Sequence, residues 1–430
     1  MIGRLASVPA FFALRILAGL VLLKLSASLL PVAGFAGFSQ FMLFAALLNI
    51  IAVGGAQNGL IRQAAASGDA AALGRVHGAA LLIWGVVAPL SAGVIAIGSG
   101  RISQILVDTP DQRRAVVGLA LVALAAGPGQ IWCSILSGRK HVVASLSAQA
   151  TGLVAGTAAA AWLIVRGEPI AATIGFAGGS LVTMAVAGRA AARLAIARVP
   201  LSVARAGAPA LLGYSAAFAA TTSWTSILLF GLRSHYRSHF GTTALGYWLV
   251  ANRISDMSTQ LLGLFLIQFF VPHFAMLGGE TERRALTARC WAAGVAVMAA
   301  IPLVFSPLAR PLVHLFLSDV YLPAIPAIRA YMIGDALRVS ASIAMFTAFA
   351  NGRPGRYAAI EIATLTLMGG ITLLLIAAGD PRAPFIGYCG AYATTAAIVV
   401  AAFLARMHVK RSLSGHPAVA ASIAARVWRK

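Results

Sequence analysis

The chain has few charged residues, few acids and few cysteines, and each shortage excludes a class of protein. Of its 430 residues, 10% are charged and 60% are hydrophobic, and the mean hydropathy is +0.88. Soluble domains carry about 25% charged residues, so the composition indicates a polytopic membrane protein. Cys133, Cys290 and Cys389 all lie in apolar runs, which leaves no spacing for a disulfide framework or a metal site.

Motifs for enzymatic chemistry and for nucleic-acid binding are also missing. The chain contains no P-loop, dinucleotide-binding fingerprint, nucleophile elbow or HExxH motif, so we expect neither catalytic residues nor a cofactor. The net charge of +22 comes without a basic block, and it therefore predicts basic cytoplasmic loops rather than a nucleic-acid partner. The first apolar run lacks a small-residue cleavage site, and we interpret it as a span rather than a signal peptide.

Apolar runs that can cross about 30 Å of hydrocarbon recur along the whole chain. We therefore predict an all-α membrane protein with twelve spans. They cover about 8–30, 38–60, 77–98, 114–136, 143–165, 170–192, 211–232, 244–271, 288–308, 327–350, 357–378 and 384–406. The positive-inside rule places both termini in the cytoplasm, because the loops on that side hold most of the Lys and Arg. Arg233 and Arg237 are assigned to a loop on the other side.

Two short matches at similar offsets, each about half the chain length, indicate an internal repeat. "LSGRKHVVASLSAQA" from Leu136 resembles "ANGRPGRYAAIEIAT" from Ala350, at an offset of 214. "AGFSQF" (36–41) resembles "LGYWLV" (245–250), at an offset of 209. We predict two six-helix lobes, 1–205 and 206–406, in a parallel pseudo-repeat, and a basic cytoplasmic tail, 407–430, on the membrane surface.

One pair of glycines predicts close packing between helices. Gly152 and Gly156 form a GxxxG motif inside the span predicted at 143–165. Small residues at this spacing let two helix backbones approach each other within a membrane.

Three of the eleven acids fall inside predicted spans, namely Asp256, Asp335 and Glu361. A charge at the centre of a span costs roughly 2.5–3.5 kcal/mol, so it normally faces a partner or water. Arg253 and Arg338 lie three residues from Asp256 and Asp335, and at this spacing each pair can neutralise itself locally. These pairs are either structural ion pairs or the lining of a wet cavity, and both interpretations stay open.

Span 8 also carries a polar stripe. Asn252 and Gln260 share one helical face with Arg253 and Asp256, which is typical of a protein interior or a cavity wall rather than a lipid-facing surface.

The first half of the chain holds cations without acids in its spans. Arg15 and Lys24 lie in the first span and Arg62 lies at the end of the second. These cations need an anion, which could be a substrate phosphate, lipid headgroups or acids of the other lobe. Arg15 and Lys24 are nine residues apart, so they point to roughly opposite faces. Arg62 is either a ligand of that anion or a positive-inside anchor.

Three stretches resemble bacterial oligosaccharide flippases of the Wzx type, in the multidrug/oligosaccharidyl-lipid/polysaccharide (MOP) superfamily. They are "KLSASLLPVAGFAGFSQFMLFAALLNIIAVGGAQNGLIRQAAA" (24–66), "YWLVANRISDMSTQLLGLFLIQFFVPHFAML" (247–277) and "MIGDALRVSASIAMFTAFANGRPGRYAAIEIATLTLM" (332–368). The subgroup of O-antigen translocases and the lipid III flippase of enterobacterial common antigen is the most similar. Its motifs are matched at Ile254–Asp256 and at Gly334, Asp335 and Arg338, whereas Arg253 departs from it and resembles lipid II flippases.

The resemblance implies a V-shaped pair of lobes in the bacterial inner membrane that moves an undecaprenyl-pyrophosphate-linked glycan to the periplasmic leaflet by alternating access. Its candidate partners are a polysaccharide polymerase and a chain-length regulator. The pyrophosphate would bind one or more of four cations: Arg15, Lys24, Arg62 and Arg253. Cavity ion pairs or coupling groups would come from four residues: Asp256, Asp335, Arg338 and Glu361. Coupling to a proton or other ion gradient stays open.

Three alternatives remain at this stage. A cation-coupled multidrug exporter would have the same fold but would favour acids unmatched by arginine. A lipid II flippase would share the mechanism and differ in the glycan. A membrane glycan polymerase or ligase would need a large periplasmic loop, which is not predicted here.

Overall fold

The computed structural model describes residues 2–53, 57–194, 196–197, 199–266, 270, 273–274, 277 and 279–414. Within these ranges all regular structure is helical. Nine of the described helical segments are long and apolar enough to cross a membrane. Helix α1 (Ile2–Leu29) and the two arms of α9 (Leu201–Phe265) bring the number of membrane-length segments to twelve. The structure therefore confirms an all-α, polytopic fold.

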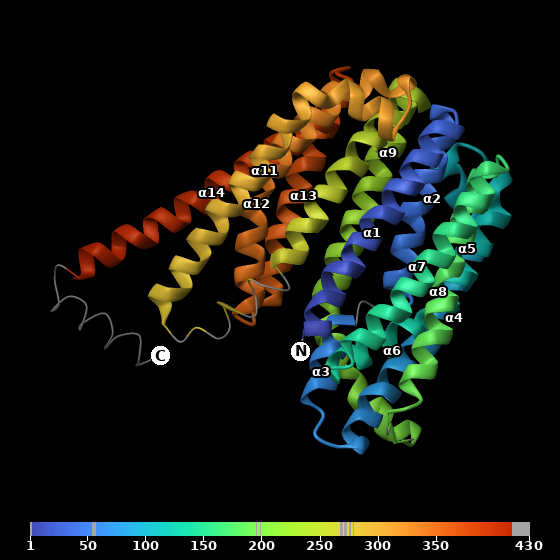
Figure 1. The fold of residues 1–430 in the computed structure, drawn as a ribbon, viewed down its shortest axis with the longest axis vertical. Coiled ribbons are helices and arrows are strands. Elements are labelled where there is room, and N and C mark those ends of the chain that lie inside the picture. Colours follow the sequence, from blue (N-terminus) through green and yellow to red (C-terminus); the bar gives the residue numbers. More distant parts are fainter. Residues whose placement is uncertain are drawn as a thin grey trace.

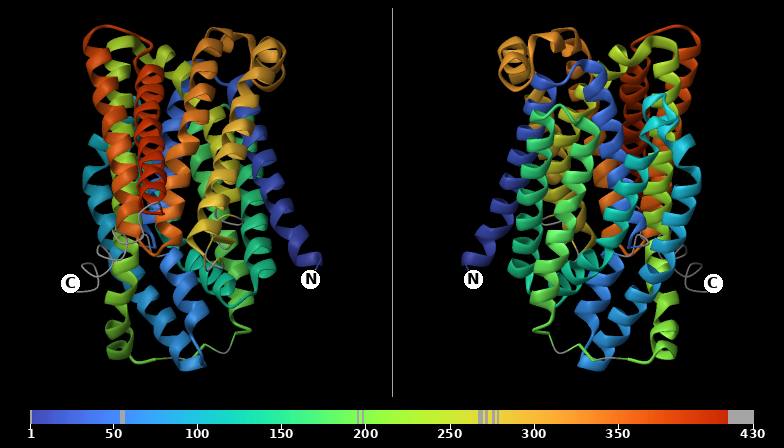
Figure 2. Two further views of the ribbon diagram at one scale, coloured as in Figure 1. Left: turned by 90° about the vertical axis from the view of Figure 1, so that its left-hand side faces the viewer. Right: turned by 90° about the vertical axis from the view of Figure 1, so that its right-hand side faces the viewer.

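The long helices run between two ends of the bundle (Figure 1). We call the end where α1 begins the lower end and the end where α1 finishes the upper end, as both side views also show (Figure 2). The remaining helices are α2 (Val32–Ile51), α3 (Gln57–Ala66), α4 (Ala70–Val107), η1 (Pro110–Gln112), α5 (Arg113–Ala125), α6 (Gly127–Gly138), α7 (Val142–Val165), α8 (Pro169–Ala191), α11 (Glu280–Phe316), η3 (Asp319–Ala324), α12 (Ile325–Ala350), α13 (Pro354–Ala377) and α14 (Ala383–Ser414).

Helix α9 consists of two arms that meet at Gly241 at the upper end. Gly241 has φ 83° and ψ 169°, a conformation that favours glycine, and it reverses the chain between residues 201–240 and 242–265. The first arm includes Arg233 and Arg237, each 5% exposed. Their assignment to a loop was wrong, because together with Tyr236 they recur at helical spacing and form a buried stripe.

The chain forms two lobes, α1–α8 and α9–α14, and the helices of the second lobe other than the first arm of α9 splay away from the first lobe towards the lower end (Figure 1). The predicted division at residues 205 and 206 falls in the first turns of α9. We keep it as a prediction, because the first arm of α9 packs on α4 and α2 as well as on α13. The predicted tail, 407–430, begins inside α14, and residues 415–430 lie outside the described residues.

Apolar cores join the lobes at the upper end. Phe35 of α2 contacts Tyr321 of η3, with ring centroids 5.6 Å apart, inside a cluster that draws residues from both lobes. Near the lower end, a separate cluster around Leu266 and Phe274 contains only second-lobe members among the described residues. A further cluster packs Leu211 of the first arm of α9 against first-lobe residues such as Leu73 and Ala79. Apart from this arm, apolar burial joins the second lobe to the first mainly at the upper end.

Helix caps reveal the repeat between the lobes. Gly167 and Gly379 both have positive φ, and so do Lys140 and Gly352, and the two pairs share one sequence offset, 212. Each follows a helix whose end closes by the same pattern. For example, the Asp380 amide donates to the Leu375 carbonyl at 3.0 Å. The parallel repeat is confirmed, and its register here differs by two from the predicted offset of 214.

The GxxxG prediction is confirmed at the contact between α7 and α8. A Cβ atom at Gly152 would overlap the Thr183 hydroxyl and the Gly179 carbonyl, and one at Gly156 would meet the Phe176 carbonyl. Glycine therefore lets the two backbones touch.

Candidate functional site

A cavity of about 420 Å³ lies between the lobes. Its walls come from α1, α2, α6, α7 and α8 of the first lobe and from the second arm of α9. Four predicted residues line it, namely Arg15, Arg253, Asp256 and Gln260. The structure thus brings one arginine of each lobe into the same cavity.

Both cavity arginines are available to a ligand. Arg15 is exposed and Arg253 is half-buried. Neither guanidinium has a hydrogen-bond or ion-pair partner among the described residues. A guanidinium presents five donors and stays protonated, so two of them without partners favour binding of a multivalent anion.

Side-chain amides form much of the remaining polar lining. Asn49, Gln130 and Gln149 lie on three different first-lobe helices and face the cavity. Gln130 accepts a bond of 3.3 Å from Gln57, and Gln149 donates one of 3.2 Å to Ser145. Since an amide has donors and acceptors to spare, each can also bind a neutral hydroxyl-rich group. Sequence reasoning missed these residues, although an amide inside an apolar span was the available signal.

A second pocket of about 190 Å³ shares Arg253 and Asp256 with the first and extends it towards the upper end. There the buried Arg233 donates to Gln40 of α2 at 3.3 Å and to Asn252 at 2.5 Å. Asn252 in turn donates to Asp256 at 3.4 Å. The predicted stripe residue Asn252 therefore links the cavity acid to a cation that sequence analysis placed in a loop.

The charges at a spacing of three do not form direct ion-pair contacts. No ion pair joins Arg253 to Asp256 or Asp335 to Arg338, all four of which are described residues. Asp335 is 1% exposed and instead accepts hydrogen bonds from Ser255 at 2.6 Å and Tyr388 at 2.7 Å. Ser258 donates a third at 2.8 Å. The spacing placed the charges correctly, but hydroxyls of α9 and α14 satisfy the carboxylate.

Three acidic or basic residues expected in the cavity lie inside the second lobe. Besides Asp335, these are Arg338, which donates to the Tyr388 hydroxyl at 3.3 Å and lies 5.4 Å from the Tyr392 ring centroid, and Glu361, which is hydrogen-bonded to Tyr357. None of the three lines the cavity between the lobes.

Lys24 and Arg62 also lie away from the cavity in this conformation. The Lys24 ammonium donates to the Leu317 carbonyl at 3.1 Å at the upper end. Arg62 is exposed on α3 at the lower end. As expected, Arg15 and Lys24 do not share one wall.

Within the described part of the chain, no group of three His, Cys, Asp or Glu side chains could hold a metal ion. The cavity chemistry is therefore that of cations, amides and one acid.

Comparison with known proteins identifies the fold. No family model matches the chain, and no curated protein matches its sequence. Among solved structures it is similar to an inward-facing multidrug resistance MATE family transporter of the MOP superfamily, with a TM-score of 0.70, 13% identity, and 93% of this chain and 96% of that chain covered. An outward-facing MATE transporter gives a TM-score of 0.60 at 14% identity, covering 94% and 95%.

The lipid II flippase MurJ in an inward closed conformation is also similar. Its TM-score is 0.66 at 13% identity, over 95% of this chain and 88% of that one. The higher score with the inward-facing MATE structure agrees with lobes that meet at one end and splay at the other. The chain therefore shares its overall fold with these solved structures.

Proposed function

We propose that this protein is a flippase that moves an undecaprenyl-pyrophosphate-linked oligosaccharide across the bacterial inner membrane by alternating access. It would serve surface polysaccharide biosynthesis of the O-antigen or common-antigen type, with a polysaccharide polymerase and a chain-length regulator as partners. In this proposal the lower end faces the cytoplasm, which agrees with the basic loops there.

The single observation that carries the proposal is a pair of arginines, one from each lobe, that line one cavity and have no hydrogen-bond or ion-pair partner among the described residues. Arg15 and Arg253 face the same space as a single acid, Asp256. A pyrophosphate carries several negative charges and accepts bidentate bonds from guanidinium groups. Because one arginine comes from each lobe, the anion would draw both lobes together, which couples binding to movement of the lobes.

The amide lining fits the sugar part of such a substrate. Asn49, Gln130, Gln149 and Gln260 offer neutral donors and acceptors along the cavity wall. Sugar hydroxyls lose their water when they enter a membrane-embedded space, and amides replace those bonds without adding charge. The polyprenyl tail would stay in the surrounding lipid.

The test is transport by the purified protein in vesicles that contain fluorescent undecaprenyl-pyrophosphate oligosaccharide. We expect Arg15→Gln and Arg253→Gln each to lower the transport rate by about tenfold or more, because each removes a charge-assisted contact. Arg101→Gln is the matched control, since Arg101 is exposed on α4 outside the cavity. Full transport by the doubly substituted protein would overturn the proposal.

Complementation identifies the glycan. Rescue of an O-antigen or common-antigen flippase mutant supports the proposal. Rescue of lost cell-wall precursor transport instead would favour the lipid II flippase alternative, for which the likeness to MurJ is the specific observation.

The cation-coupled drug exporter alternative rests on the likeness to MATE transporters and on Asp256 in the cavity. It predicts the opposite response to charge. Arg253→Gln would then strengthen export of organic cations, and Asp256→Asn would abolish it. The glycan polymerase alternative is not proposed, because all upper-end connections between described helices are short.

A further inference from the structure

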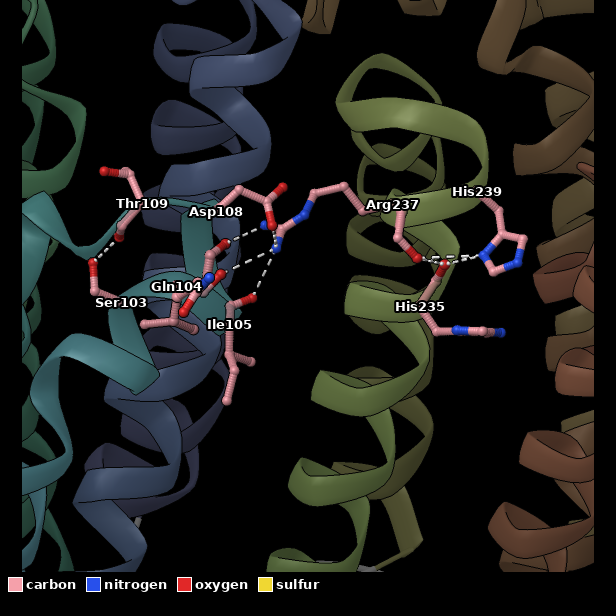
Figure 3. Close-up of polar contacts among 10 residues, drawn as sticks. Ser103, Gln104, Ile105, Asp108, Thr109, His235, Arg237 and His239 are labelled. Atoms are coloured by element: carbon pink, nitrogen blue, oxygen red, sulfur yellow. Dashed lines mark hydrogen bonds and ion pairs between the residues drawn. The ribbon is translucent and has the colours of Figure 1, made fainter.

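Arg237 crosses from the second lobe to the end of a first-lobe helix. Its guanidinium donates to the carbonyls of Leu106 at 2.8 Å and Ile105 at 3.2 Å, both in the last turn of α4. It also pairs with Asp108, the residue that caps α4, at 2.6 Å. Figure 3 shows Arg237 reaching from its own helix to this helix end. We call this contact the arginine clasp.

Lys24 makes the reverse crossing, from the first lobe to the end of a second-lobe helix. Its ammonium donates to the carbonyls of Leu317 at 3.1 Å and His314 at 3.4 Å, where α11 ends. Ser28, one turn further along α1, donates to the same Leu317 carbonyl at 3.0 Å. We call this contact the lysine clasp.

The two clasps are copies of each other under the internal repeat. The sequence offset from Lys24 to Arg237 is 213, and the offset between the two accepting residues, Leu106 and Leu317, is 211. Each value lies one residue from the offset of 212 between the equivalent helix caps, so the contacting residues are neighbours of the equivalent positions. In each case the first membrane segment of one lobe binds the end of the third segment of the other, just before a short 3₁₀ helix.

Helix ends explain why these contacts bind. The last carbonyls of a helix have no partner within the helix, and the helix dipole places partial negative charge there. A cation satisfies both. For α11 that cation comes from α1 of the opposite lobe. For α4 it comes from the upper end of the first arm of α9, whose lower part also packs on α4 near Ala79. The two helix ends are satisfied in this way only while these upper-end segments stay in contact.

We propose that Lys24 and Arg237 form a paired lock that holds the lobes closed at the upper end and opens in each transport cycle. This inference rests on the alternating-access part of the proposed function. When the lobes separate at this end, both cations and both helix ends meet water at the membrane surface. Water then replaces the lost hydrogen bonds, which lowers the free-energy cost of opening the lock. At the membrane centre no water would replace them, and opening would cost more.

The two clasps differ in strength. The Arg237 side chain is 4% exposed and contacts three carbonyls and a carboxylate, whereas Lys24 is half-buried and contacts two carbonyls. The arginine clasp should therefore contribute more to closure than the lysine clasp.

The test measures the distance between spin labels across the upper end of the full-length protein in nanodiscs, without substrate. Labels are placed on cysteines introduced at Asp111 in η1 and Val320 in η3, both exposed. We expect Arg237→Met to raise the ratio of open to closed molecules by about tenfold and Lys24→Met by about threefold. The double variant should show the product of the two effects, because the clasps are independent.

Charge-preserving variants are the matched controls. Lys24→Arg and Arg237→Lys keep a cation at each helix end, so the closed distance should return for most molecules. If Arg237→Met does not fold, Lys24→Met alone decides the question. An unchanged distance in a folded variant that has lost a clasp would overturn the lock. A protein that transports no lipid-linked glycan could still show the distance change, so failure of the lock and failure of the proposed substrate are distinguishable.

Discussion

The two lobes share a repeat but are held together internally by different forces. In the first lobe, α7 and α8 touch through Gly152, Gly156 and Gly179, where a side chain would collide with the neighbouring backbone. In the second lobe, α9, α12 and α14 are joined by hydroxyls that surround the buried Asp335. A buried charged residue such as Asp335 can therefore stabilise the packing within one lobe, while other charged residues line the cavity between the lobes.

The largest effect is expected from removing the centre of the second-lobe network. Asp335→Ala leaves the buried hydroxyls of Ser255 and Tyr388 without their acceptor, while Ser258 keeps the Ser255 carbonyl. The substitution should lower the free energy of unfolding by about 3 kcal/mol. The measurement is the midpoint of unfolding in detergent. Asp335→Asn keeps one oxygen acceptor and should lose less.

Asp256→Ala is the matched control for that variant. Its carboxylate receives one 3.4 Å bond, from Asn252, and lies at the cavity. Its substitution should change stability little and transport strongly. If both alanine variants lost the same stability, Asp335 could not be called a structural acid and Asp256 a cavity acid.

The first lobe should be destabilised by a change in packing rather than by the loss of a hydrogen bond. Gly152→Val forces α7 away from α8, because the added atoms overlap Thr183 and the Gly179 carbonyl. We expect a loss of about 1–3 kcal/mol, typical of overpacking in a filled interior, seen as an earlier unfolding midpoint. Gly178→Val is the control, because nothing lies within 4 Å of a Cβ atom at that position. A drop of the same size at Gly178 would mean that helix propensity, not contact, determines the loss.

Hydropathy and spacing predicted the spans and the glycine contact because both depend on the local chain. They did not predict the partners of Asp335, because these partners are hydroxyls on other helices. Their distance from Asp335 cannot be inferred from the sequence around it. Arg233 shows the opposite error. Its charge suggested a loop, but Gln40 and Asn252 satisfy it inside the bundle. Of the cations named from sequence, Arg15 and Arg253 line the cavity because they lie at the same depth in the bundle. The sequence predicted only which face of its helix each arginine occupies.

The smallest effect is expected at two equivalent turns on the upper end. In the second lobe, Asp380 accepts a hydrogen bond from the Arg382 guanidinium at 3.0 Å and a second from the Arg382 backbone N–H at 2.8 Å. These bonds, the guanidinium bond above all, lower the pKa of the carboxyl. In the first lobe, Glu168 occupies the corresponding turn and forms no ion pair with a described residue.

A lowered pKa in the folded state means that the Asp380 contribution is present above the unfolded pKa of about 3.9 and is lost as pH falls through the folded value. Asp380→Asn should therefore lower the melting temperature at pH 7 by only about 1 °C, because the pair is solvent-screened, and the gap to the natural protein should close under acid. Melting curves of the natural protein, Asp380→Asn and Glu168→Gln, recorded from pH 7 into acid, test this prediction. For Glu168→Gln, the difference in melting temperature from the natural protein should not shrink at low pH. Glu168 forms no ion pair with a described residue that would favour its charged form. A gap that stays constant with pH would assign the effect of Asp380 to turn geometry rather than to its charge.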